Sequence, residues 1–292
     1  MRYEITVKLE YDYARTATLA RHVLHLMPRT VEGMQRVIAA SLAISPRAQS
    51  EERRQDFFGN TVHALHYREE HNEIEITLRA RVERHLMLPS LDVAPPLPQL
   101  AAELAAWTDL GPDSPLHFLS PSPRVPDVTP FRAFAQGLVT PEMTTLEAMR
   151  AIAKALHARM TFDDEATEVD TPPEEAFRKG RGVCQDYSHI MIACCRAIGL
   201  PAGYVSGLLR TIPPPGQERL PGSDAMHAWV RVWCGAGIGW REYDPTNALD
   251  VTDDHVLVAY GRDYADVAPI RGVSRTAGGH SGRHSVDVVP LD

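Results

Sequence analysis

The residues best placed to do chemistry begin a predicted helix just after a pair of glycines. Residues 180–189 read GRGVCQDYSH, so Cys184 follows two glycines and opens an apolar-periodic segment. The amides and dipole at a helix N-terminus favour the thiolate over the thiol, and glycines before it leave room for a substrate backbone. Cys184 is therefore a candidate nucleophile.

The chain has three other cysteines, and each has a structural interpretation. Cys194 and Cys195 lie in the middle of the same helix among apolar residues, and Cys234 lies in a glycine-rich turn. A buried cysteine usually behaves as a small hydrophobic residue. No C-x-x-C pair is present, so neither a structural zinc site nor any other metal or cofactor is expected.

A candidate base lies further along the chain, on a predicted hairpin formed by residues 226–233 and 239–244. If Trp233 pairs with Trp240, His227 lies on the same face as Asp244 and within diagonal reach of it. A slip of one residue would place the two side chains on opposite faces. The pairing therefore predicts a histidine held by a carboxylate at the end of a strand.

Cys184, His227 and Asp244 are together the residue types of a catalytic triad. The thiolate attacks a carbonyl carbon, His227 stabilises it as an ion pair and later protonates the leaving group, and Asp244 orients the ring. The Cys184 backbone amide is expected to supply part of the oxyanion stabilisation.

The pattern of the chain predicts an α+β protein. Alternating segments at 3–9, 72–78 and 80–86 indicate a β-rich N-terminal domain over residues 1–90. Residues 91–130 are expected to be a proline-rich linker with one helix, and residues 131–292 to form the core that holds the candidate triad.

Within that core the helix boundaries are well marked. Thr144 and Glu147 form a capping box, a second helix ends near Gly180, and the Cys184 helix is expected to end near residue 198. Strands are expected at 202–210, 226–233 and 239–244. Residues 211–224, which contain several prolines, are expected to form a mobile loop over the site.

Composition excludes several classes of function. The net charge is −8, and no large cluster of basic residues is present, so nucleic acid and anionic membranes are not expected partners. No apolar run approaches the length of a membrane span, and Glu4 interrupts any signal peptide. A cytoplasmic protein is expected, and the sequence leaves its oligomeric state open.

Three short stretches carry a resemblance to a known family. Residues 181–187 (RGVCQDY), 227–230 (HAWV) and 243–247 (YDPTN), with a later stretch over 254–267, resemble the bacterial branch of the transglutaminase-like superfamily, whose members are often described as cysteine proteases. The resemblance implies a papain-like α+β core, with the nucleophile helix packed on an antiparallel sheet, after a β-rich N-terminal domain.

The resemblance leaves the reaction open, because the superfamily includes proteases, amidases, crosslinking transferases and inactive members. The preferred interpretation is a cysteine hydrolase that acts on a peptide, protein or other amide substrate through an acyl-enzyme at Cys184. One alternative is a protein-glutamine γ-glutamyltransferase, in which an amine replaces water as the acceptor. Another is a binding module that keeps the fold without activity.

Overall fold

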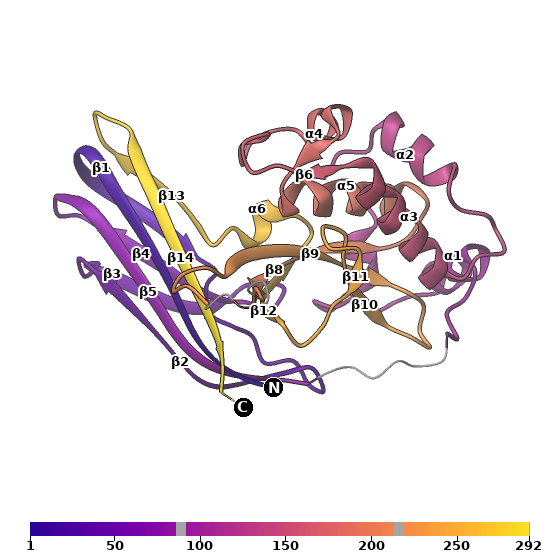
Figure 1. Ribbon diagram of the computed structural model, residues 1–292, viewed down its shortest axis with the longest axis horizontal. Helices are drawn as coiled ribbons and strands as arrows, with labels where there is room; N and C mark the ends of the chain where they lie inside the picture. Colours follow the sequence, from indigo (N-terminus) through magenta and orange to yellow (C-terminus); the bar gives the residue numbers. More distant parts are fainter. Residues whose placement is uncertain (86–91, 213–215, 217–218, 292) are drawn as a thin grey trace.

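The computed structural model of the protein describes residues 1–85, 92–212, 216 and 219–291. Two antiparallel sheets dominate the fold, and helices cover one of them (Figure 1). The β-rich sheet extends from one side of the molecule, and the helices gather over the other sheet on the opposite side. The α+β fold class predicted from the sequence is confirmed.

The N-terminal sheet is built around one very long strand. Its main order is β2-β5-β1-β4-β3, with β13 and β14 also paired to β1. Tyr3, Ile5, Val7 and Leu9 alternate towards the interior of this sheet, as the sequence predicts. The strands are β1 (Arg2–Leu24), β2 (Gln35–Ser45), β3 (Ser50–Gln55), β4 (Thr61–Tyr67), β5 (His71–Arg84), β13 (Ile270–Arg275) and β14 (His280–Pro290).

The C-terminal strands change the division expected from the sequence. Residues 131–292 were expected to form one core, but β14 pairs along the first half of β1 and β13 along its second half. The chain ends therefore meet, and the two termini lie close together in Figure 1. Only Val286 and Val288 are buried in β14, so its alternation is too short to identify a strand from the sequence.

The second sheet carries the candidate site. Its order is β11-β10-β9-β8-β12, and all of its pairs are antiparallel. Its strands are β8 (Ala202–Leu209), β9 (Ala225–Trp233), β10 (Trp240–Asp244), β11 (Leu249–Asp250) and β12 (His255–Gly261), and a separate short parallel pair joins β6 (Thr161–Phe162) to β7 (Arg181–Gly182).

The helices begin and end largely where the sequence places them. The Thr144 side chain accepts from the Glu147 amide at 3.2 Å, and Glu147 accepts from the Thr144 amide at 2.8 Å, which confirms the capping box. The helices are α1 (Leu97–Ala105), the 3-10 helix η1 (Pro115–Phe118), α2 (Thr129–Gln136), α3 (Thr145–Arg159), α4 (Pro173–Lys179), α5 (Cys184–Ala197) and α6 (Tyr264–Val267).

The region expected to be a linker contains α1 and η1, and Leu100, Leu104 and Phe118 from these helices are buried in the core. Its first residue, 91, and residues 86–90 before it lie outside the described residues.

Helix α5 is buried on more sides than the apolar periodicity of its sequence predicts. Every residue from Gln185 to Arg196 is buried, because β8 and β9 cover one side and α2, α3 and α4 the others. Some of its polar residues find partners within the protein. Arg196, for example, donates to the carbonyl oxygens of Ala202, Ser120 and Arg262.

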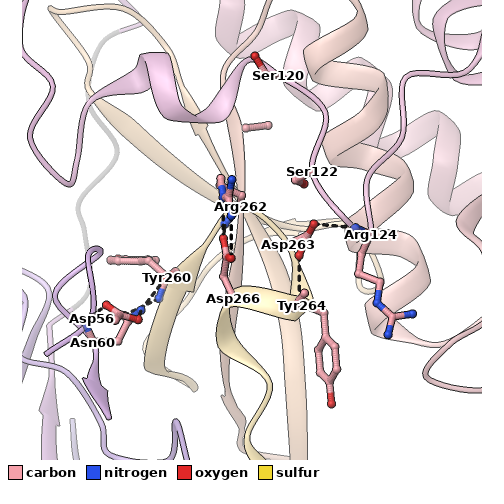
Figure 2. Close-up of polar contacts among 12 residues, drawn as sticks. Asp56, Asn60, Ser120, Ser122, Arg124, Tyr260, Arg262, Asp263, Tyr264 and Asp266 are labelled. Carbon is pink, nitrogen blue, oxygen red and sulfur yellow. Dashed lines mark hydrogen bonds and ion pairs between the residues drawn. The ribbon is translucent and has the colours of Figure 1, made fainter. Parts of the chain in front are cut away.

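The N-terminal sheet is tied to the core through the outer edge of β12. The Asn60 side-chain amide donates to the Tyr260 carbonyl at 2.7 Å and accepts from the Tyr260 amide at 2.9 Å (Figure 2). Gln35 makes the same pair of hydrogen bonds with Leu257, at 2.7 and 2.9 Å. Two side-chain amides thus replace a neighbouring strand and cover an edge that would otherwise expose unpaired backbone.

Asn60→Ala is expected to destabilise the protein through this edge. The buried amide and carbonyl of Tyr260 would each lose their partner, at about 1 to 3 kcal/mol for each group. Urea unfolding monitored by circular dichroism measures the loss. Asn72→Ala, at an exposed position of β5, is the matched control and should change the unfolding free energy by less than about 0.5 kcal/mol. Equal stability of the two variants would contradict the role of the amide.

Candidate active site

Cys184 is the first residue of α5 and the only half-buried cysteine of the four. Val183 precedes it in extended conformation, so the chain turns sharply from β7 into the helix. The first amides of a helix have no partner within it and favour negative charge nearby. The thiol predicted to be reactive therefore lies at the N-terminus of α5, where a reagent can reach it.

The turn before Cys184 is fixed by Asp186. Its Oδ2 atom accepts from the Val183 amide at 2.8 Å and from the Thr167 hydroxyl at 2.7 Å. A Cβ atom on Gly182 would lie 2.5 Å from this oxygen, so the close approach requires glycine there. Burial raises the pKa of Asp186, which these two hydrogen bonds partly offset. Asp186 holds the start of the helix in place.

His227 and Asp244 meet as the predicted register requires. Trp240 pairs with Trp233, and the Nε2 atom of His227 lies 2.7 Å from Oδ2 of Asp244. Both side chains are buried, and Asp244 has no exposed surface. Because Nε2 is engaged with the carboxylate, Nδ1 is the ring nitrogen that remains for Cys184.

The charges of this pair support each other. Burial opposes a charge on His227, but hydrogen bonds with Asp244 and Cys184 outweigh it and raise the pKa of His227 to about 10. Burial also opposes ionisation of Asp244, yet hydrogen bonds from His227 and His255 hold the pKa of this carboxyl far below its usual range. The arrangement favours an imidazolium beside an ionised carboxylate.

Asp244 accepts further hydrogen bonds from the turn that follows β10. Its Oδ1 atom accepts from the amides of Thr246 at 2.9 Å and Asn247 at 3.1 Å, and its Oδ2 atom accepts from the Asn247 side chain at 2.7 Å. His255 Nε2 lies 3.1 Å from the same Oδ2 atom. Neither Asn247 nor His255 was predicted to belong to the site.

His227, Asp244 and His255 are also the one group of candidate metal ligands within the described parts of the chain, with donor atoms within 4.8 Å of one another. A metal ion would need the same two histidine nitrogens that face the Asp244 carboxylate. Both nitrogens lie within hydrogen-bond distance of this carboxylate. The geometry therefore fits hydrogen bonds to Asp244 better than coordination of a metal ion.

Comparison with known proteins agrees with this fold. Residues 132–245 match the Transglutaminase-like superfamily, and residues 3–83 match the Bacterial transglutaminase-like N-terminal region. An uncharacterised protein of Mycobacterium tuberculosis is 34% identical over 305 residues, which cover all of this chain and 93% of the relative. The chain belongs to the transglutaminase-like superfamily.

A further relative of this transglutaminase-like protein and a solved structure with the same fold both span nearly its whole length. An uncharacterised protein of Mycobacterium leprae is 29% identical over 294 residues, covering 98% of this chain and 96% of the relative. The crystal structure of a protein named "Putative Cysteine Protease" from Cytophaga hutchinsonii has the same fold, with a TM-score of 0.77 and 21% identity, and the match covers all of this chain and 91% of that one.

Trp229 and its hydrogen-bond partners pack beside the histidines of the transglutaminase-like core. The Trp229 indole donates to Glu242 at 2.7 Å, and the Tyr260 hydroxyl donates to the other Glu242 oxygen at 2.6 Å. A Cβ atom on Gly207 would lie 2.2 Å from the Trp229 ring, so only glycine leaves space for this indole. Sequence reasoning missed Glu242 and Gly207, since neither residue type on a strand indicates such a contact.

His189 has a structural role. It accepts a hydrogen bond from the Tyr264 amide at 3.2 Å, and burial lowers its pKa to about 4, so the ring stays neutral. This contact attaches α6 to α5.

The loop expected over the site is only partly within the described residues, because 213–215 and 217–218 lie outside them. Its base is held closed: the Thr211 amide donates to Asp224 at 2.7 Å, and Arg219 pairs with both Asp224 and Asp287.

Among the helices of the residues that the structure describes, none combines the length and the apolar character that a membrane span requires.

The His227 pKa predicts how this site contributes to stability. Folding raises the pKa of His227 from 6.5 to about 10, so protonated His227 contributes its full stabilisation of the folded protein below pH 6.5. This contribution to the unfolding free energy is lost as the pH rises towards 10. The advantage of the wild type over His227→Gln in urea unfolding should therefore shrink between pH 6 and pH 10. A difference that stays constant over this range would contradict a charged His227 in the folded protein.

Proposed function

We propose that the protein is a cysteine hydrolase of the transglutaminase-like superfamily, which cleaves an amide or isopeptide bond through an acyl-enzyme at Cys184. The observation that carries the proposal is the convergence of a half-buried cysteine at a helix start with a buried histidine–carboxylate pair. Cys184 is also among the groups that raise the pKa of His227, which links the two parts.

In the first step the Cys184 thiolate attacks the substrate carbonyl carbon. The C–N bond breaks as His227 gives its proton to the departing amine, which leaves a thioester on Sγ. The Cys184 amide, at the start of α5, would stabilise the negative oxygen of the tetrahedral intermediate. Asp244 fixes the tautomer and orientation of His227 and stabilises its positive charge.

In the second step water attacks the thioester carbon while neutral His227 accepts its proton. The C–S bond breaks, the acid product leaves, and the thiolate–imidazolium pair is restored. An amine acceptor would follow the same course and form a new amide, which is the transferase alternative. The name of the Cytophaga protein with the same fold agrees with hydrolysis.

A substrate panel tests the proposal. Peptide amides, isopeptides and a glutamine-bearing protein with a labelled primary amine are incubated with the enzyme in parallel, and intact-mass spectra are recorded after acid quenching. We expect amide cleavage with a thioester on Cys184, and no turnover by Cys184→Ala. Turnover by a folded Cys184→Ala variant would contradict the proposal, and label incorporation without cleavage would identify a transferase.

The other cysteines provide the matched controls. Burial raises the pKa of Cys194 and that of Cys234 to about 12 each, so both thiols stay protonated near neutral pH. Cys194→Ala should keep turnover and lose only packing, about 1 kcal/mol or somewhat more. Loss of chemistry in this variant with the fold intact would place the nucleophile elsewhere.

A further inference from the structure

We propose that His255 is a positioning residue, which holds the Asp244 carboxylate at the same oxygen that His227 contacts. The inference rests on the proposed function, and it assigns a role to a histidine that takes no part in the triad. His255 is only 2% exposed, and its Nε2 atom lies 3.1 Å from Asp244 Oδ2.

The proton of His255 can be placed from its other contact. A backbone amide can only donate, and the Thr252 amide donates to Nδ1 of His255 at 3.3 Å. Nδ1 is therefore an acceptor, and in the neutral ring Nε2 carries the hydrogen. His255 thus donates to Asp244 through Nε2 and leaves the carboxylate charged.

The His255 ring is held by a ring contact and by the strand that carries it. It packs edge-on against Trp229, with ring centres 5.2 Å apart and planes at 82°. Its backbone begins β12 opposite Leu209 of β8, and Gln35 holds the outer edge of the same strand at Leu257. The donor that reaches Asp244 is therefore anchored to both the core sheet and the N-terminal sheet.

These contacts fix the orientation of the Asp244 carboxylate. Oδ2 accepts from His227, His255 and Asn247, while Oδ1 accepts from two backbone amides. Without His255, Oδ2 would lose the donor on one side, and the direction in which it points at His227 would be less well defined. A misdirected His227 holds the Cys184 thiolate less well, so the loss would appear in the reactivity of Cys184.

The test compares substitutions that keep or remove the donor. His255→Gln keeps an N–H at similar reach, whereas His255→Leu keeps the volume without a donor. The readout is the rate of Cys184 alkylation by iodoacetamide at pH 6.5, with the fold checked by circular dichroism. We expect His255→Leu to slow alkylation about 10- to 100-fold, in the range seen when an outer-shell partner is lost, and His255→Gln to restore it to within a few-fold.

His22→Leu is the matched control, since His22 is also a buried histidine on a strand but pairs with β4 and β13 in the N-terminal sheet. It should leave alkylation unchanged. If His255→Leu does not fold, His255→Asn decides, because its shorter amide cannot reach Oδ2 and should be as slow as the leucine variant is expected to be.

Several results would overturn the positioning role. These are a folded His255→Leu or His255→Asn that alkylates like the wild type, a His255→Gln as slow as His255→Leu, or a wild-type rate lost with EDTA and restored by Zn²⁺. The last would show that the three side chains hold a metal. Slow alkylation in His227→Ala with normal rates in the His255 variants would overturn this inference alone, whereas a wild type no faster than His227→Ala would overturn the proposed function as well.

Discussion

The site depends on one buried negative charge. Asp244 has no contact with solvent, and an ionised carboxylate in such a place is tolerated only when donors replace the water it has lost. The structure supplies them from the turn after β10, from His227 on β9 and from His255 on β12. Strand register, the turn after β10 and the strand order together bring donors to the same two oxygens.

This requirement connects the two sheets of the molecule. Strand β12 carries one of the Asp244 donors, and its outer edge is paired by side-chain amides from the N-terminal sheet rather than by another strand. The final strands of the chain then return to that sheet and pair with β1 (Figure 1). The β-rich region is thus part of the framework that supports the site, although it carries none of the candidate triad.

Much of the site was predictable because its determinants are local. A glycine-flanked cysteine at a helix start, a capping box at Thr144 and the pairing of Trp233 with Trp240 can each be inferred over a few residues, and the last two are confirmed. His255 could not be inferred in the same way. It reaches Asp244 only because β12 crosses to the far edge of the sheet, next to β8, and no local pattern encodes that strand order.

The contrast between local and long-range determinants also explains where the observed fold differs from the predicted one. Strand β14 has few buried residues because much of one face is exposed, so its sequence shows little alternation. Helix α5 looks one-sided in sequence, yet it is surrounded, because Arg196 and His189 find partners in distant segments. Long-range hydrogen bonds bury polar residues that a periodicity argument assigns to the surface.

The central claim is that His227 and Asp244 activate Cys184, and the pH dependence of its alkylation tests this most directly. Iodoacetamide rates would be measured from pH 4 to pH 9 for the wild type, His227→Ala and Asp244→Asn. A free cysteine has a pKa of about 8.5 and reacts slowly at pH 6. We predict that the wild type keeps most of its rate at pH 6, that His227→Ala reacts only at alkaline pH, and that Asp244→Asn lies between them. Three identical profiles, each like that of a free thiol, would contradict the account.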